Sequence, residues 1–250
     1  MLRFIDYMEA DSITQQAVIA LLIQHFYENE PHELVRERIV RSIQTDEQIV
    51  KCMKVDGQFV GVTTYKIFDW DRLKKQLYLQ TQCIGDIITH LRLLPFQDVL
   101  GAIGITSPSQ HVAELSYTVI TDGFRGQGVQ TQAFNERLRE IISQLEDATV
   151  FTIAMSRYQG TDVNHKLTQF MLDVEATING KNDKGSVNVL GEWVTIEAIE
   201  NGLNLRLSPL LCTMGSPQTR HLAEKFGLKY AGLSRNLSPV YASTLADMKL

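Results

Sequence analysis

The stretch AELSYTVITDGFRGQGVQTQAFNERLRE, Ala113–Glu140, decides the fold. From Ala113 to Thr121 the residues alternate between two faces, as the period of a β-strand requires. Asp122-Gly123 then ends the strand. The following apolar residues recur every three or four positions, the spacing of a helix buried along one side. They are Val129, Ala133, Phe134, Leu138, Ile141, Ile142 and Leu145. The stretch therefore predicts a strand, a glycine-rich turn and a helix.

The turn Arg125-Gly126-Gln127-Gly128 lies where this helix begins. The first backbone N–H groups of a helix have no partner within the helix, and the helix dipole is positive at that end. A phosphate or pyrophosphate group is bound by such an end without any lysine. Gly126 and Gly128 let the backbone approach an anion closely, and Arg125 adds a positive charge. The turn therefore predicts an anion site.

Two common phosphate motifs do not match the turn. A dinucleotide-binding turn has glycine at its first, third and sixth positions and an acidic residue at the end of the next strand, and a P-loop has Gly-Lys-Ser/Thr. Neither pattern occurs at Arg125–Gln130.

The segment resembles the acyl-CoA site of the GNAT N-acetyltransferase superfamily, whose turn reads Arg/Gln-x-x-Gly-x-Gly/Ala between the fourth strand and the third helix. Arg125 and Gly128 match this pattern, and Gln130 departs from it where the family has a small residue against the pyrophosphate. The resemblance implies acetyl-CoA as acyl donor. The residues it implies for binding are Val119, Thr121, Arg125, Gly126, Gln127, Gly128, Val129 and Gln130.

The elements before this stretch follow the order of the same family. The pattern predicts a strand at Leu2–Tyr7, a helix capped by Asp11 or Ser12, a helix at Glu33–Ile43, and a hairpin of Gln48–Val55 and Phe59–Phe68 around Asp56-Gly57. The resemblance implies an α/β fold, a mixed twisted sheet flanked by helices.

We expect residues 1–250 to form a single GNAT-like domain with insertions at about 69–112 and 149–209. The spacing of leucines and isoleucines predicts one or two helices in the first insertion. The second insertion is expected to hold a strand at Thr149–Ala154, a helix at Val163–Ile178 and extra strands near Val189–Ile196.

The segment Ser216–Leu233 resembles the C-terminal signature of the family, with Glu224–Leu228 at the end of a helix that Ser216-Pro217 begins. Many members have a tyrosine before that Glu-Lys pair, which protonates the departing thiolate; this chain has Ala223. Some branches place Ser or Thr four residues earlier, where Thr219 lies. Thr219 is therefore a candidate catalytic residue, and the alternative is a first-turn residue that bonds to the backbone.

The segment His25–Pro31 looks like the Phe-Phe-x-x-Glu-Pro segment of arylalkylamine N-acetyltransferases, whose glutamate acts as general base through water. Glu30 corresponds to that glutamate. The alternative is that Glu30-Pro31 only ends a helix, since a residue before proline avoids helical geometry.

A base is needed because an alkylamine, with a pKa of about 10.4 like that of lysine, is almost fully protonated at neutral pH. Glu114, the base position of other GNAT branches, is the second candidate, and a solvated strand residue is its alternative. The resemblance implies that backbone N–H groups near Val119 stabilise the oxyanion.

Composition excludes several function classes. A net charge of -5 with interspersed signs argues against nucleic acid as partner. Three widely spaced cysteines without metal-ligand spacing indicate a reduced protein and suggest no metal site. No segment has the pattern of a signal peptide or a membrane span, so we expect a cytoplasmic protein that does not bind membranes.

Taken together, the residues and the resemblance predict an acyl-CoA-dependent N-acyltransferase. It would transfer acetyl to a primary amine, an arylalkylamine-like small molecule, by direct attack in a ternary complex. The alternatives are a peptide or protein N-terminal acetyltransferase, and a GNAT-like sensor or interaction protein that binds acyl-CoA. The oligomeric state stays open, with a dimer among the possibilities.

Overall fold

A computed structural model of the chain divides into two compact units. Unit 1 comprises Met1–Asp69, Gln110–Val150 and Leu250, and unit 2 comprises Trp70–Ser109 and Phe151–Lys249. The structure describes residues 1–27, 30–45, 48–69, 78–82, 91–95, 100–106, 111–158, 162, 165–166, 169–170, 172–173, 186–189, 192–195, 197–199, 202–204, 214–234 and 237–249. Unit 2 thus contains both expected insertions together with the C-terminal segment. The expectation of a single GNAT-like domain is not tested by this division and stays a prediction.

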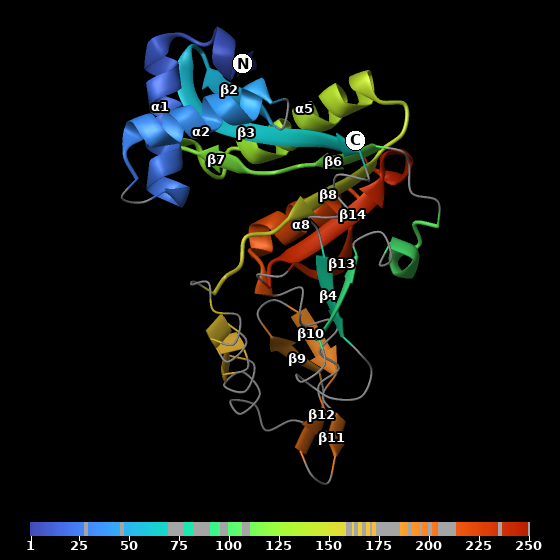
Figure 1. Ribbon diagram of the computed structural model, residues 1–250. Helices are drawn as coiled ribbons and strands as arrows, with labels where there is room; N and C mark the ends of the chain where they lie inside the picture. The colour runs from blue at the N-terminus through green and yellow to red at the C-terminus, as the bar shows by residue number, and fades with distance from the viewer. Residues whose placement is uncertain are drawn as a thin grey trace. The chain divides into compact units, whose positions relative to one another are not determined.

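Unit 1 is an α/β unit whose element order follows the prediction (Figure 1). Its elements are β1 (Leu2–Asp6), η1 (Tyr7–Glu9), α1 (Ser12–Phe26), α2 (His32–Gln44), β2 (Ile49–Val55), β3 (Gln58–Asp69), β6 (His111–Glu114), β7 (Thr118–Ile120), η3 (Asp122–Phe124) and α5 (Val129–Gln144). β8 (Thr149–Ile153) begins in unit 1 and ends in unit 2. β1 pairs with β2, β2 with β3, and β3 with both β6 and β7, all antiparallel.

Local signals explain where the first elements begin and turn. The Asp11 carboxylate accepts a hydrogen bond of 2.7 Å from the Thr14 N–H, which confirms Asp11 as the cap of α1. The β2–β3 turn holds Asp56 at φ 49° and Gly57 at φ 85°. Positive φ at both central residues fits the twist of a tight hairpin, and the predicted hairpin is confirmed.

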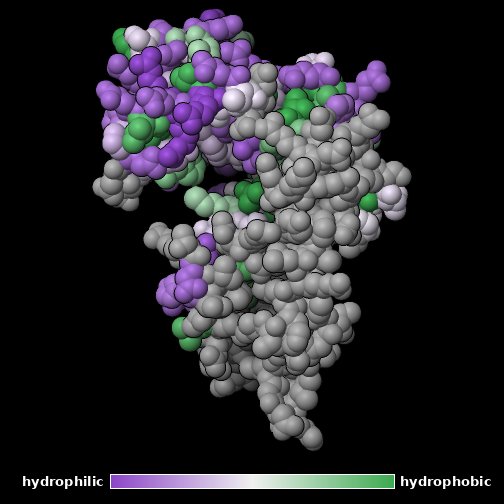
Figure 2. Space-filling view, viewed as in Figure 1, coloured by the Kyte–Doolittle hydropathy of each residue, from purple (hydrophilic) through white to green (hydrophobic). Residues whose placement is uncertain are grey.

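Helices cover both faces of the unit 1 sheet. Consecutive residues of β2 point to opposite faces: Cys52 packs with Val18 and Leu22 of α1, whereas Met53 packs with Val129 and Ala133 of α5. Figure 1 shows α1 and α2 on one side of β3 and α5 on the other. The predicted α/β class, a sheet flanked by helices, is confirmed. The outer surface over α1 and α2 is mainly hydrophilic (Figure 2).

The predicted continuous strand at Ala113–Thr121 is wrong, because a β-bulge divides it into β6 and β7. Lys66 of β3 pairs with Glu114, and Thr63 pairs with Thr118, so two residues of β3 lie opposite the three residues Leu115–Tyr117. The extra residue breaks the period-two alternation and bends the strand. The alternation of residues between two faces did not predict this bulge.

Unit 2 contains two antiparallel hairpins of longer strands. They are β4 (Tyr78–Gln82) with β5 (Leu91–Pro95), and β13 (Lys229–Ser234) with β14 (Pro239–Thr244). β13 also pairs with β4. The predicted inserted helices are therefore wrong over β4 and β5, because apolar runs of this length fit a buried strand as well as a helix. The stretches of that prediction at 70–77, 83–90 and 96–99 lie outside the described residues.

The second insertion agrees with its prediction where it is described. His165, Lys166, Gln169, Phe170, Leu172 and Asp173 are helical. The extra strands form two small hairpins, β9 (Ser186–Val189) with β10 (Glu192–Thr195) and β11 (Glu197–Ile199) with β12 (Gly202–Asn204). None of the helices in the described part of the chain has the length and apolarity that a membrane span needs.

The helix α8 (Pro217–Lys225) begins with proline as predicted, and Gly227 follows it at φ 86°. The Leu228 N–H donates to the Ala223 carbonyl, and the Gly227 N–H donates to the Glu224 carbonyl. This pair of bonds closes a helix with a left-handed residue. The residues Glu224–Leu228 therefore form the end of α8 and the turn that follows it.

Candidate anion cradle and β-bulge

The predicted anion cradle lies at the start of α5. Gly128 is the N-cap residue at φ 77°, Gly126 has φ 75°, and no side chain caps the helix. A Cβ atom built on either glycine meets nothing within 4 Å. The turn is therefore open around both glycines among the described residues, and the first N–H groups of α5 lie without a side-chain cap at the positive end of the dipole, which suits an anion. Gln130 lies in the first helical turn, half-buried.

Arg125 is held beside the cradle by three contacts. Its Nε donates to the Ile120 carbonyl at 3.4 Å, and its Nη2 lies 3.1 Å from an Asp122 oxygen. The same Nη2 lies 3.1 Å from Nε2 of His25, whose Nδ1 lies 2.9 Å from the Leu21 carbonyl. Since that carbonyl only accepts, Nδ1 carries the proton and Nε2 accepts from Arg125. No local pattern indicated this role of His25, because it and Arg125 are far apart in the chain.

Thr64 of β3 is the centre of the hydrogen bonds at the bulge. Its carbonyl accepts from the Ser116 N–H at 3.2 Å and from Nη1 of Arg137 at 3.1 Å. Its N–H donates to the Tyr117 carbonyl at 2.9 Å, and its hydroxyl accepts from the Tyr117 N–H at 3.3 Å. The Ser116 hydroxyl is buried and bonds to no atom of the described residues. These hydrogen bonds fix the backbone of the bulge, and the Ser116 hydroxyl is left without a partner among the described residues.

The strand β7 offers backbone groups along one edge. The Thr121 N–H donates to the Val60 carbonyl at 2.9 Å, so this N–H is used within the sheet, and the binding roles predicted for Val119 and Thr121 stay predictions. Hydrogen-bonded pairs alternate in an antiparallel ladder, which directs the N–H of Val119 to β3 as well. The groups of Thr118 and Ile120 point to the other edge, which no strand pairs in the described part of the chain.

The two candidate bases differ in how tightly they are paired. Both oxygens of Glu30 bind Arg38, with contacts of 2.9 and 3.2 Å. Glu114, directly before the bulge, lies 3.7 Å from Nζ of Lys66, its partner across the strands. The Glu30 carboxylate thus has a structural role between α1 and α2, whereas the Glu114 carboxylate is held loosely beside the bulge.

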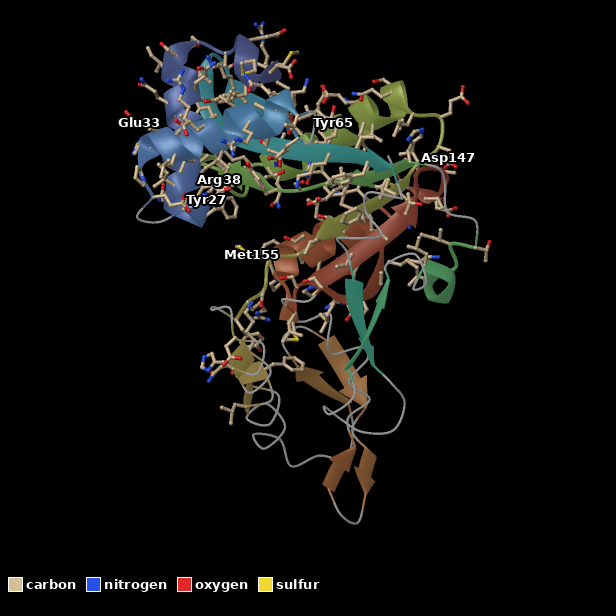
Figure 3. The ribbon with its side chains drawn as sticks, viewed as in Figure 1. Tyr27, Glu33, Arg38, Tyr65, Asp147 and Met155 are labelled. Atoms are coloured by element: carbon tan, nitrogen blue, oxygen red, sulfur yellow. The ribbon has the colours of Figure 1, made fainter. Side chains whose placement is uncertain are left out.

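Aromatic side chains gather where α1 ends near the bulge. The ring of Phe26, which is 41% exposed, lies 5.1 Å from the ring of Tyr117. The Arg38 guanidinium lies over the ring of Tyr27 at 4.7 Å, and Figure 3 shows these two side chains together. Burial raises the pKa of Tyr117 above its ordinary value, so its phenol stays protonated. The cluster gives this part of unit 1 an aromatic surface.

The remaining sequence candidates lie in unit 2 or carry no catalytic geometry. Thr219 is half-buried in the first turn of α8, and its catalytic role stays a prediction. Ala223 is buried. No group of metal-ligating side chains occurs among the residues that the structure describes.

No protein-family model matches this sequence, and no curated protein matches it. Several solved structures are similar in part. An aminoglycoside 6'-N-acetyltransferase complexed with coenzyme A has 14% identity and a TM-score of 0.47 over 97% of both chains. A Desulfovibrio desulfuricans protein assigned to the GNAT acetyltransferase family has 8% identity and a TM-score of 0.45 over 98% of this chain and 99% of that one. A Clostridium acetobutylicum protein assigned as an acetyltransferase, solved with acetyl-CoA, has 10% identity and a TM-score of 0.38 over 65% of this chain and 93% of that one. Identities and TM-scores this low carry no conclusion about the function of this chain.

Proposed function

We propose that this protein is an acyl-CoA-dependent N-acyltransferase that transfers acetyl from acetyl-CoA to a primary amine. The observation that carries the proposal is the order of features along one segment. A strand bulges at Leu115–Tyr117 and continues at Thr118–Ile120 with an edge that no described strand pairs. It then leads through two left-handed glycines into a helix that no side chain of the described residues caps. The segment thus offers a backbone edge followed by an anion site.

Each feature suits one part of acetyl-CoA. The N–H groups at the start of α5, together with Arg125, bind the pyrophosphate. The backbone groups of Thr118 and the Ile120 N–H, which no strand pairs in the described part of the chain, bind the amides of the pantetheine arm as a neighbouring strand does. With acetyl-CoA bound in this way, the thioester would lie near the bulge and near Glu114, the residue directly before it.

The reaction is a direct attack. Glu114, through a water molecule, removes a proton from the ammonium form of the acceptor, and the neutral nitrogen attacks the thioester carbon. Nearby backbone N–H groups stabilise the oxyanion that forms. The C–S bond then breaks with its electron pair on sulfur, and the thiolate takes the proton that the attacking nitrogen loses as the amide forms. Glu30 is the alternative base.

For the acceptor we propose an arylalkylamine. The support is the partly exposed Phe26 ring packed on Tyr117 at the end of α1, a surface that stacks aromatic groups. A peptide N-terminus is the alternative, favoured by the acidic chain. The solved protein named above that acts on aminoglycosides adds a third amine class to test.

The test has two measurements. Acetyl-CoA should raise the melting temperature, because a ligand that binds only the folded state stabilises it by RT ln(1 + [L]/Kd). Thiol release should then be followed with 2-phenylethylamine, tyramine, a short peptide and kanamycin as acceptors. Stabilisation without thiol release would identify a sensor. No stabilisation would overturn both functions.

A further inference from the structure

Arg137, in the middle of α5, is a buried cation. Only 4% of the residue is exposed, and Nη1 donates to the Thr64 carbonyl. Its Nε has no hydrogen-bond partner, and none of the ion pairs among the described residues involves it. The guanidinium carbon lies 5.2 Å from the centre of the Phe134 ring. Burial lowers the pKa of Arg137 to about 9, which leaves it charged at neutral pH.

Such a group destabilises the folded protein. A buried charge loses its hydration, and here neither a carboxylate nor a full set of acceptors replaces that hydration. An apolar residue of similar size, such as methionine, would fill the same space without this cost. Stability therefore does not explain a guanidinium at this position.

The position of the charge offers another explanation. Nη1 binds the same carbonyl oxygen that accepts the Ser116 N–H, so Arg137 reaches the bulge from the face of the sheet that α5 covers. A positive charge in a low-dielectric interior acts on nearby negative charge far more strongly than in water. In the proposed reaction negative charge develops beside this bulge.

We propose that Arg137 is a positioning residue for acyl transfer. It fixes the Thr64 carbonyl, and through it the bulge, and its positive field favours the oxyanion that forms there. The inference rests on the proposed function, because it concerns the same site.

The test substitutes Arg137→Met, which removes the charge and keeps much of the volume. We expect kcat with acetyl-CoA and 2-phenylethylamine, or the best amine of the panel, to fall about tenfold or more, because oxyanion stabilisation acts on the chemical step. The KM for acetyl-CoA should stay within about twofold, and the melting temperature should stay equal or rise. Arg137→Lys, which keeps the charge, should recover part of kcat. Arg139→Met on the exposed face of α5 is the matched control and should change neither.

The inference is overturned if Arg137→Met keeps the wild-type kcat, or if kcat falls only in proportion to a loss of folded protein. If the methionine variant does not fold, Arg137→Gln is measured by the same criteria, because glutamine retains one donor for Thr64 without the charge. The wild-type chain is assayed first. A wild-type chain that releases no thiol refutes the proposed function, whereas an active wild type with unaffected variants refutes the role of Arg137 alone.

Discussion

Two cations on the α5 side of the sheet, the partly buried Lys51 and the buried Arg137, differ in their surroundings. Nζ of Lys51, on β2, lies 2.7 Å from a Glu140 oxygen and 3.0 Å from an Asp6 oxygen. Arg137 binds one backbone carbonyl and has no carboxylate partner in the described part of the chain. The charge of Lys51 is neutralised by two carboxylates. The charge of Arg137 is not neutralised by a carboxylate of the described residues, so it can attract another negative charge.

The polar groups of unit 1 therefore fall into two kinds: those paired with one another, and those left without a partner. Groups that satisfy one another, such as Lys51 with its two carboxylates and Glu30 with Arg38, hold elements together. Other groups are left open. They include the N–H groups at the start of α5 and, among buried side-chain atoms of the described residues, the Ser116 hydroxyl and Nε of Arg137, which belong to residues at the bulge; the other two such atoms are the Tyr7 hydroxyl and Oε2 of Glu140. Buried polar groups without partners cost stability, so they point to function. The following experiments test this distinction.

The largest effect is expected at the cradle. Gly128→Glu places a negative side chain at the anion site, and we expect the affinity for acetyl-CoA to fall more than about 100-fold, by repulsion and by loss of close approach. Gly57→Glu is the matched control, since Gly57 also has positive φ and open space around its Cβ position. Both variants should lose similar stability from backbone strain, measured by thermal unfolding. Equal losses of affinity in calorimetric titration would contradict the cradle assignment.

The next effect compares the two carboxylates. Glu114→Gln should lower kcat about 100-fold and flatten the rate profile at acid pH, because a general base contributes about this much. Glu30→Gln should change kcat less than about threefold, since both oxygens of Glu30 already bind Arg38. The measurement is the pH dependence of thiol release for each variant. The reverse result would make Glu30 the base.

Lys51→Met should reduce the free energy of unfolding by about 2 kcal/mol, because it leaves the Glu140 and Asp6 carboxylates without their cation. Lys54→Met is the control on the same strand, and its Asp11 partner is largely exposed, so the loss should be smaller. Burial alone would lower the pKa of Lys51, but the hydrogen bonds to Glu140 and Asp6 outweigh it and raise that pKa above the ordinary 10.5. The contribution is therefore complete at neutral pH and is lost as the pH rises beyond that value. Urea unfolding at pH 7 and above pH 10 checks both statements.

The smallest effect is expected at Arg125, whose side chain is 57% exposed. Arg125→Met should raise the KM for acetyl-CoA about fivefold with little change in kcat, because an exposed charge contributes modestly and is screened by salt. Arg139→Met, which removes the cation of another exposed i,i+3 pair, should leave KM unchanged. The effect of Arg125→Met should shrink when KM is measured at high salt. A large, salt-independent change would mean that Arg125 acts in a dry site.

Local signals allowed much of unit 1, and the start of α8 in unit 2, to be predicted. The cap at Asp11, the turn at Asp56-Gly57 and the proline start of α8 each depend on residues only a few positions apart. The helices predicted over β4 and β5 failed because short apolar runs carry no decisive period.

The glycine turn at the start of α5 could be predicted from consecutive residues, because Asp122-Gly123 ends a strand and a helix of period 3.6 follows the two glycines. Tertiary structure alone decided the bulge opposite Thr64, the contact of Arg137 with that residue, and the pairing of Arg125 with His25. These join residues dozens of positions apart, and which of them meet is fixed by strand register and by the packing of α5 on the sheet.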